Sequence, residues 1–295
     1  MHRDAFKKIA LYCTDCRTFE HGRIIQHKLD LSTDKISGEY VISGHFECPS
    51  CGKQFPIIGG VPCLVSSIST HEDLTNQYLD AHYSEINNEY WNTLDTRYTG
   101  NLCLDAGCST GRYTFDCGKK GFTIGIDIKL EDLRLAAEFQ RTGKVAFTRK
   151  TRTLAHEEIE SSFEPPENVL FLQADINNPP FGTETFDFIS GLNLIDSVRL
   201  PLTTLGQMDA MLKRNGRLLL STPYAWDPEI SEEFLEDKDT DPHTFVKKLL
   251  TGDIIPETGF HYRILEGEKG IPWLMRKHDT LHFRYNADLI IAEKL

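Results

Sequence analysis

The stretch Asn101-Leu102-Cys103-Leu104-Asp105-Ala106-Gly107-Cys108-Ser109-Thr110-Gly111-Arg112 decides the fold of this chain. Residues 101–105 read as a short buried strand, and the glycines after it predict a tight turn that opens a helix. A strand, a glycine turn and a helix amino terminus place free backbone N–H groups where a ligand carboxylate or phosphate can sit. Asp105 stands where dinucleotide-binding chains carry the first glycine of GxGxxG. A negative charge there repels a pyrophosphate and suits a cationic amino group.

Two later strands of the expected sheet also end in acidic residues. The segment 122–127 reads as a buried strand that ends in Asp127, where a carboxylate can accept both hydroxyls of a ribose. A third strand at 169–176 carries Asp175 near its end. Each acid has a second interpretation, because Asp105 and Asp127 can cap the helices that follow and Asp175 can begin a turn. The order of three acids at successive strand ends favours a nucleoside-containing ligand.

From about residue 100 to residue 222, these motifs resemble in order those of the class I S-adenosylmethionine-dependent methyltransferases. The resemblance implies an α/β fold with a doubly wound, mostly parallel seven-stranded sheet, and S-adenosylmethionine as cofactor. The residues that it implies for cofactor binding are Asp105, Gly107, Cys108, Gly111, Asp127, Ile128, Asp175, Ile176 and Asn193. The chain departs from the family motif at Cys108-Ser109, where a third glycine is often found. This departure is costly only if the position needs a positive φ.

The segments after the fourth and fifth strands are candidates for the methyl-acceptor site. Gly191-Leu192-Asn193-Leu194-Ile195-Asp196 follows the fourth strand, and Thr222-Pro223-Tyr224-Ala225-Trp226 follows the fifth. This combination is similar to the methyltransferase half of ovothiol-forming enzymes and to bacterial methyltransferases with an N-terminal zinc ribbon. Asp196 either orients a substrate amine or caps the next helix. Tyr224 and Trp226 either wall the acceptor site or pack under the following segment. The sequence assigns no catalytic base.

Four cysteines near the start form two short-spaced pairs, Cys13-Thr14-Asp15-Cys16 and Cys48-Pro49-Ser50-Cys51. Each pair spans a tight turn that can point two thiolates at one cation, and four thiolates suit tetrahedral zinc. All four ligands then come from the protein, so the zinc is expected to be structural.

The run Phe55-Pro56-Ile57-Ile58-Gly59-Gly60-Val61-Pro62 after the second pair carries a second resemblance. Residues 10–66 resemble the small zinc-ribbon partner subunit that supports several transfer-RNA, ribosomal-RNA and release-factor methyltransferases. The resemblance implies a docking or stabilising module and an RNA or protein partner for the ribbon. It does not identify a substrate.

The 295 residues include 32 basic and 44 acidic side chains, and the formal net charge is −12. This charge argues against wrapping nucleic acid by a general electrostatic footprint. Residues 1–68 carry 8 basic and 7 acidic residues, so the excess of acid lies beyond residue 68. No run approaches the ~20 apolar residues that a membrane span needs, and the start of the chain lacks the apolar core of a signal peptide. We expect a cytoplasmic protein without a membrane partner, and the oligomeric state stays open.

Composition and pattern divide the chain into three expected parts. They are a zinc ribbon at 1–68, a helical linker at 69–99 with packed aromatic residues, and a methyltransferase domain at 100–295. Within the last, the acidic segment 225–258 reads as a cover over the sheet. A helix is expected from Pro201 to Leu212 with a C-cap at residues 214–216. Two antiparallel strands are expected at 260–265 and 281–292, with residues 273–278 in the connection between them.

One segment between the second and third strands is strongly basic. Residues 141–152 contain Arg141, Lys144, Arg149, Lys150 and Arg152 and no acidic residue. They can contact phosphates of an RNA substrate, the zinc ribbon, or acidic surface of the same chain.

Together these patterns predict methyl transfer from S-adenosylmethionine to an N, O, S or C nucleophile. The ribbon and the basic segment favour RNA or a translation protein as acceptor, whereas the acidic surface favours a small molecule. The alternative is a catalytically inert, cofactor-binding partner protein that uses the ribbon as an interaction module.

Overall fold

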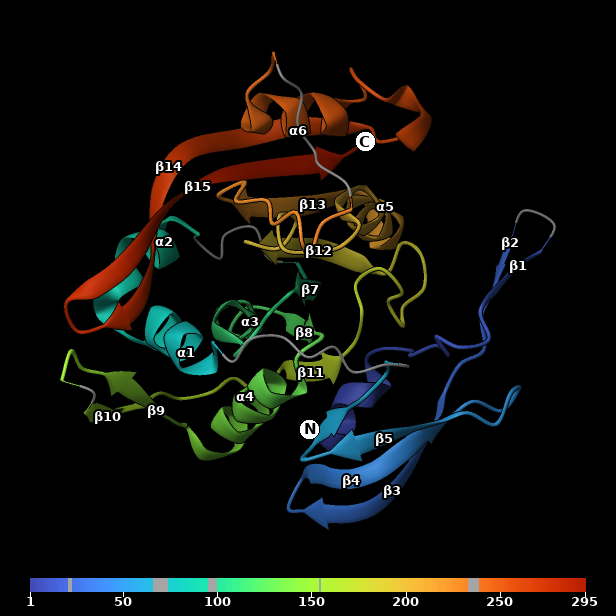
Figure 1. Cartoon of the computed structure of the whole chain (residues 1–295). Coiled ribbons are helices and arrows are strands. Elements are labelled where there is room, and N and C mark those ends of the chain that lie inside the picture. Colours follow the sequence, from blue (N-terminus) through green and yellow to red (C-terminus); the bar gives the residue numbers. More distant parts are fainter. Residues whose placement is uncertain (21–22, 66–73, 95–99, 154, 233–238) are drawn as a thin grey trace.

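The computed structural model describes residues 1–20, 23–65, 74–94, 100–153, 155–232 and 239–295, and its centre is a seven-stranded sheet (Figure 1). The strand order is β11-β8-β7-β12-β13-β15-β14. The bounds are β7 (Leu102–Ala106), β8 (Phe122–Asp127), β11 (Val169–Gln173), β12 (Phe186–Leu192), β13 (Leu212–Thr222), β14 (Tyr262–His278) and β15 (Leu281–Lys294). All neighbouring pairs from β11 to β13 are parallel, and β15 runs antiparallel to both of its neighbours. The predicted doubly wound, mostly parallel sheet is therefore confirmed.

The central strands form because their residues are apolar almost without interruption, as in a sheet that is covered on both faces. Every residue of β11 is buried, and β7 and β8 are each buried except at one end. The helices are α1 (Thr75–Tyr83), α2 (Asn88–Thr93), α3 (Arg112–Gly118), α4 (Leu130–Thr142), α5 (Pro201–Met211) and α6 (Pro242–Thr251), with 3-10 turns η1 (Arg3–Lys7), η2 (Glu85–Asn87) and η4 (Pro256–Thr258). Helices α3 and α4 pack against β8 and β11, α5 against β13, and α6 against β14.

The amino-terminal part forms a second sheet with the order β3-β4-β5-β6. Its strands are β3 (Asp30–Ser37), β4 (Tyr40–Glu47), β5 (Gln54–Ile58) and β6 (Val61–Pro62), and a separate hairpin joins β1 (Thr18–Glu20) to β2 (Arg23–Ile25). Just after β6, the backbone N–H of Leu64 donates to the carbonyl of Gln173 at 2.8 Å, and Cys63 forms a parallel bridge to the same residue. The segment after β6 thus lies along β11 and covers part of an edge that would otherwise offer unpaired backbone groups.

The turn that holds the first two cysteines packs against the loop after β11. The N–H of Tyr12 donates to the carbonyl of Pro180 at 2.9 Å, and Asn178 donates through Nδ2 to the carbonyl of Thr14 at 3.0 Å. Arg17 reaches the carbonyl of Pro179 in the same loop. The small sheet and the central sheet are therefore tied at two places, the edge of β11 and the loop behind it.

The aromatic residues before β7 pack as predicted where the structure describes them. Tyr90 is fully buried, with its ring centroid 4.7 Å from that of Trp273 on β14. Trp91 lies edge-on to the same indole at 5.5 Å. The last aromatic residue of the segment, Tyr98, lies outside the described residues.

Two details of the carboxy-terminal half differ from the prediction. Residues 273–278 lie in β14 and not in a connection, because Trp273 and Met275 are buried and alternate with less buried residues. The turn between β14 and β15 consists only of Asp279 and Thr280. Residues 214–216 do not cap α5, which ends at Met211. Asn215 takes a φ of +61° within β13, where the pairing with β12 shifts register.

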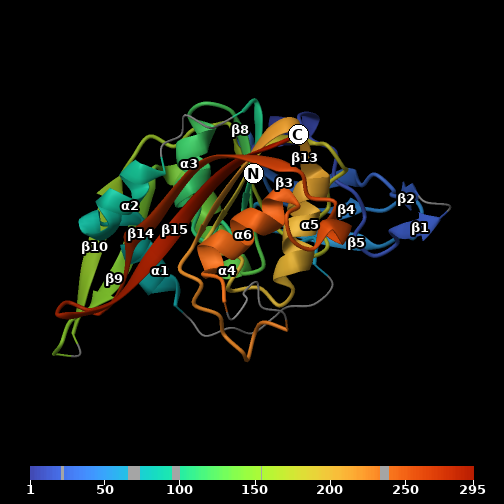
Figure 2. The ribbon, with the colours of Figure 1, turned by 90° about the horizontal axis from the view of Figure 1, so that it is seen from above.

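The basic segment 141–152 contains the end of α4 and the first strand of a hairpin that the sequence did not predict. Its strands, β9 (Lys144–Lys150) and β10 (His156–Ser162), pair with each other apart from the central sheet. Viewed from above, this hairpin and the long β14–β15 hairpin extend to the same side of the molecule (Figure 2). Among the described residues, no helix has the length and apolar character needed to span a membrane.

Candidate functional site

The turn after β7 needs unusual backbone geometry, which explains its glycines. Gly107 has φ +71° and Gly111 has φ +82°, backbone angles that residues with a side chain rarely adopt. A Cβ on Gly111 would lie 2.7 Å from two ring atoms of Phe171 on β11. Gly111 therefore lets α3 begin directly against the sheet.

Ser109, where the family motif often has glycine, also has a positive φ of +46°. A non-glycine residue in this region costs roughly 1–3 kcal/mol. Two hydrogen bonds offset this strain: the N–H of Ser109 donates to Oδ2 of Asp127 at 2.8 Å, and its Oγ donates to Asp132 at 2.9 Å. The buried Asp132 also accepts from Oγ1 of Thr75 at 2.7 Å, so it joins α1 and α4 to the turn. No local pattern predicts this network, because its members are distant along the chain.

The expectation of free N–H groups in this turn is wrong for most of its residues. The N–H groups of Gly107 and Cys108 both donate to the carbonyl of Ile126, at 2.8 and 2.9 Å, and that of Gly111 donates to the carbonyl of Cys108. Cys108 itself is 5% exposed. A ligand at this edge must therefore be recognised mainly by the side chains that follow the strands.

Asp105 is a buried carboxylate at the end of β7 and is 2% exposed. Its Oδ2 accepts from Thr114 Oγ1 at 2.7 Å, and its Oδ1 accepts from Ser190 Oγ at 2.8 Å. Burial raises its pKa to about 6, although both hydroxyl donors favour the charged form. The carboxylate also interacts with the backbone N–H of Thr114 in the first turn of α3, so the capping interpretation holds as well, and Asp105 joins β7 to α3 and β12.

Asp127 lies across the turn from Asp105, at the end of β8. Its Oδ1 accepts from the N–H of Lys129 at 2.9 Å, at the start of α4, and its Oδ2 accepts from Ser109. Burial raises the pKa of this carboxyl group. Each carboxylate oxygen can accept a second hydrogen bond, so these contacts are compatible with ribose hydroxyl donors. Ile128 follows it and is half-buried.

Asp175 comes after β11 and is exposed to solvent. Its Oδ1 accepts from the N–H of Asn177 at 2.8 Å, so it does begin the turn that the second interpretation expects. Its other oxygen makes no hydrogen bond within the described part of the chain and can accept one from a ligand. Ile176 is buried at 7% exposure beside it.

The loops after β12 and β13 hold buried polar atoms without partners among the described residues. Asn193 has φ +51°, and its N–H donates to the carbonyl of Ser221 at 2.6 Å, but its side-chain oxygen is unsatisfied. Asp196 is 2% exposed; one oxygen accepts from the N–H of Ala225 at 2.8 Å, and the Thr222 hydroxyl also favours the charged carboxylate, while its Oδ1 has no partner within hydrogen-bond distance among the described residues. The hydroxyl of Tyr224 is likewise buried and unsatisfied. An unmet buried polar atom costs about 1–3 kcal/mol, so this cluster is a candidate site for a polar ligand.

Asp196 therefore joins the two loops and does not cap α5, which starts at Pro201. Trp226 lies beside Tyr224, with ring centroids 6.5 Å apart, and both pack against the core. Burial raises the pKa of Asp196.

Tyr78 on α1 is a candidate that the sequence did not single out. Burial, together with the nearby carboxylates of Asp127 and Asp132, raises its pKa to about 12, and Asp196 and Tyr285 also act on it. The sequence pattern predicted that the aromatic residues of this segment pack against the next domain, and Tyr78 does pack against the core.

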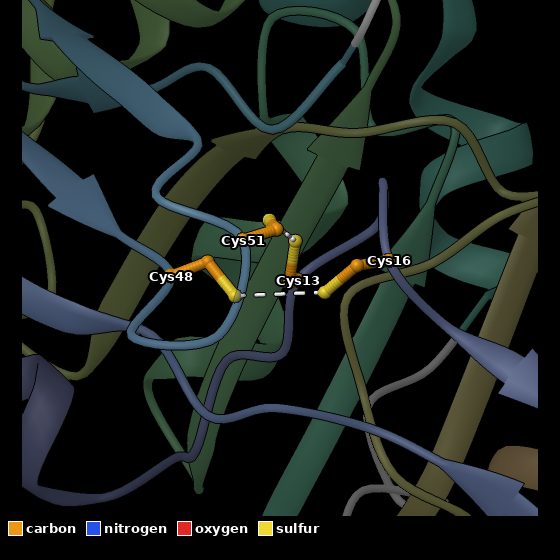
Figure 3. Close-up of side chains that lie close together, drawn as sticks. All are labelled: Cys13, Cys16, Cys48 and Cys51. Atoms are coloured by element: carbon orange, nitrogen blue, oxygen red, sulfur yellow. Dashed lines mark hydrogen bonds between the residues drawn. The ribbon is translucent and has the colours of Figure 1, made fainter.

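The four cysteines of the two pairs come together as predicted. All four Sγ atoms lie within 4.8 Å of one another, and they point toward a common centre (Figure 3). Sγ of Cys13 is 3.8 Å from that of Cys51, and Sγ of Cys16 is 3.6 Å from that of Cys48. Zn–S bonds of ~2.3 Å in a tetrahedron place sulfurs about 3.8 Å apart, so this donor set fits zinc. All four corners are protein ligands, which leaves no position for a catalytic water.

Comparison with known proteins supplies one family match. Residues 99–266, more than half of the chain, match a family model described as a methyltransferase domain. A search of the curated proteins found no match.

Many solved structures are similar to this chain at low identity. A S-adenosylmethionine-dependent methyltransferase from Methanosarcina mazei is 20% identical, with a TM-score of 0.44, over 67% of this chain and 95% of that chain. One from Aquifex aeolicus is 17% identical, with a TM-score of 0.47, over 77% and 100%. A chain of the Haloferax volcanii complex between the Trm112 methyltransferase activator and a putative methyltransferase is 13% identical, with a TM-score of 0.47, over 77% and 99%.

Proposed function

The chain belongs to the methyltransferase-domain family, and on this premise we propose that it transfers a methyl group from S-adenosylmethionine to an acceptor held by the loops after β12 and β13. The expected class, a class I S-adenosylmethionine-dependent methyltransferase, agrees with the family match and with the strand order. Three acidic residues carry the proposal: Asp105 near the end of β7, Asp127 at the end of β8 and Asp175 just after β11.

The residues at this edge fit the cofactor by charge and position. When bound, S-adenosylmethionine supplies a methyl group already activated on a sulfonium. Asp127 accepts the ribose hydroxyls, Asp175 accepts the adenine amino group, and Ile128 and Ile176 cover the adenine faces. The carboxylate of Asp105 attracts the cationic amino group of the cofactor's methionine part. Gly107, Cys108 and Gly111 shape the turn, and Asn193 contacts the methionine end.

The acceptor side is defined by atoms that can only accept hydrogen bonds. The free oxygens of Asp196 and Asn193 call for N–H or O–H donors, which an amine or amide acceptor supplies. With Tyr224 and Trp226 as walls, these residues position the nucleophile and exclude water, which is the main task because the methyl group is already activated. A small molecule and an RNA or translation-related macromolecule both supply such donors. The unsatisfied oxygen of Asp196 favours an active enzyme over the alternative of an inert partner protein, because an inert protein has no acceptor to position.

We assign structural zinc to Cys13, Cys16, Cys48 and Cys51, in a ribbon at 1–68 followed by a linker at 69–99 and a catalytic domain at 100–295 with its cover at 225–258. The junctions near residues 68 and 99 lie outside the described residues. The ribbon or segment 141–152 provides the surface for an RNA or protein partner. The proposed location is the cytoplasm.

Calorimetric titration of the zinc-loaded protein with S-adenosylhomocysteine tests the cofactor site. We expect binding of this compound and none of NAD, and about tenfold to hundredfold weaker binding for Asp127→Ala, because a hydrogen bond to a charged group contributes ~1.5–3 kcal/mol. Glu131→Ala, which removes an exposed acid four residues away on α4, is the matched control and should bind normally. Preference for NAD, or unchanged affinity in Asp127→Ala, would overturn the assignment.

The raised pKa of Asp105 predicts opposite effects on stability and binding. Its folded pKa of about 6 exceeds the value of 3.8 for a free side chain, so the stability that it contributes below pH 3.8 is lost as the pH rises through 6. At pH 7.5, the free energy of unfolding of Asp105→Asn, measured with urea, should therefore exceed that of the parent by up to about 3 kcal/mol. This difference should shrink toward pH 4.5. The same variant should bind S-adenosylhomocysteine more weakly at pH 7.5. Equal stability at both pH values would contradict the burial argument.

A further inference from the structure

Two hairpins that are far apart in the sequence meet beyond the carboxyl edge of the sheet. The pairing of β13 with β15 ends at Thr222 and Asp288, so residues 269–287 project past the strand ends where the acceptor loops begin. At the tip, the N–H of Asp279 donates to the carbonyl of Lys150 at 3.1 Å, and the N–H of Arg152 donates to Oδ1 of Asp279 at 2.8 Å. Both views show the tips side by side (Figures 1 and 2).

The joined tips carry exposed cations. Lys150, Arg152 and Lys277 are exposed, and the described part of the chain shows no ion pair for Lys150 or Lys277. Arg152 lies beside the carboxylate of Asp279, which accepts from its backbone N–H. Other basic residues nearby are already paired: Arg149 and Arg276 both bind the buried carboxylate of Asp80, Arg149 also pairs with Glu157, and Lys144 pairs with Glu160. Among the described residues of the tips, Lys150 and Lys277 therefore keep their positive charge for a ligand, in a chain of net charge −12.

Apolar and aromatic side chains are exposed on the same structure. Leu281, Phe283 and Tyr285 are 43%, 48% and 36% exposed, and their alternate positions on β15 place them on one face. Their cross-strand neighbours on that face, Met275 and Trp273, are buried against the core that contains α1 and α2. The rings of Phe283 and Tyr285 follow each other at about 7 Å along the strand, and each keeps part of its surface open to solvent.

We propose that this surface, formed by Lys150, Arg152, Lys277, Leu281, Phe283 and Tyr285, binds a single-stranded nucleic acid beside the acceptor loops. Exposed cations bind the phosphates, and the two rings stack with unpaired bases, the combination that single-strand binding surfaces use. An acidic peptide would pair with the cations but has no base to stack on the two rings. A duplex has its base faces already stacked and offers none to the rings. The proposal rests on the methyl-transfer function, for which it supplies the acceptor class.

Fluorescence anisotropy of the full-length, zinc-loaded protein with labelled 12-nucleotide oligouridylate measures this binding. Oligodeoxythymidylate, a 12-base-pair RNA duplex and polyglutamate are the comparison probes. We expect both single strands to bind, more tightly than the duplex or the peptide. The double variant Phe283→Ala/Tyr285→Ala should bind oligouridylate at least tenfold more weakly, since each stacked base contributes ~1–3 kcal/mol.

The charges are tested by the salt dependence. Lys150→Gln/Arg152→Gln should lower the slope of log K against log salt by about 1.4, or about 0.7 for each lost phosphate contact on a single strand. The matched control is Lys248→Gln/Ile255→Ala, which removes an exposed cation from the last turn of α6 and an exposed apolar side chain after it and should change neither result.

Binding of S-adenosylhomocysteine separates this proposal from the preceding one. All three double variants should keep the cofactor affinity of the parent chain. If the parent binds the cofactor but binds no single strand, or if the ring variant binds oligouridylate unchanged, the nucleic-acid surface is wrong and methyl transfer stands. Equal binding of polyglutamate would assign the surface to an acidic protein instead. Loss of cofactor binding in the parent itself would overturn methyl transfer.

Discussion

Cys48→Ser is expected to lose the zinc and to unfold the small sheet locally. Structural zinc sites hold on the order of 10 kcal/mol of apparent binding free energy in zinc-finger peptides at neutral pH, and one missing thiolate removes a corner of the tetrahedron. The four Sγ atoms lie within 4.8 Å of one another, which four thiolates do not tolerate without a cation. Metal analysis should fall from about one zinc per chain to near zero, and thermal unfolding should begin at a lower temperature.

The loss of zinc should also reach the cofactor site. The turn at Cys13 and Cys16 holds the loop that follows Asp175, through the contact of Tyr12 with Pro180 and that of Asn178 with Thr14. Loosening this loop should weaken binding of S-adenosylhomocysteine.

Cys117→Ala is the control for the zinc prediction, because Cys117 is equally buried but lies on α3, away from the cluster. It should keep the zinc content of the parent. Retention of metal by Cys48→Ser, with an unchanged unfolding temperature, would show that the four thiolates do not form one site.

Gly111→Ala is expected to destabilise the catalytic part by about 2–5 kcal/mol. A left-handed backbone costs a residue with a Cβ roughly 1–2 kcal/mol, and overpacking costs a further ~1–3 kcal/mol. Both terms apply, because Gly111 has φ +82° and its Cβ would lie 2.7 Å from two atoms of the buried Phe171 ring and 3.2 Å from Ala136. Urea unfolding measures the loss, and calorimetry should show weaker cofactor binding because the turn must move.

Gly206→Ala provides the opposite case on the same scaffold. Gly206 lies within α5, and a Cβ there would meet nothing within 4 Å. This change should stabilise the chain by roughly 0.5–1 kcal/mol, since alanine loses less backbone entropy in a helix. If Gly111→Ala is as stable as Gly206→Ala, the close packing of the turn against β11 is not a real constraint.

The sequence predicted the parts of the fold that rest on local pattern. Continuous apolar runs and glycine turns located β7, β8 and β11, and cysteine spacing located the four-sulfur cluster. The doubly wound, mostly parallel seven-stranded sheet was expected from the family resemblance and not from these patterns.

Contacts between distant segments could not be predicted in this way. Nothing local marks Leu64 as the neighbour of Gln173, or Asp132 as the acceptor for both Ser109 and Thr75. Residues 273–278 resembled a connection because Lys277 and His278 are polar, whereas burial of Trp273 and Met275 against distant helices makes most of them strand. Two of the N–H groups expected to be free in the glycine turn, those of Gly107 and Cys108, donate to the carbonyl of Ile126 on the neighbouring strand β8.

The hydrogen bond from Leu64 to Gln173 joins two sheets that belong to one polypeptide. Docking of the small sheet on β11 is therefore intramolecular, and tethering through a short linker gives an effective concentration in the millimolar range. Dilution cannot separate the two parts, and a modest contact area suffices to keep them together. A mutation that weakens this contact should show as faster amide hydrogen exchange along β11, at a rate independent of protein concentration, and not as dissociation.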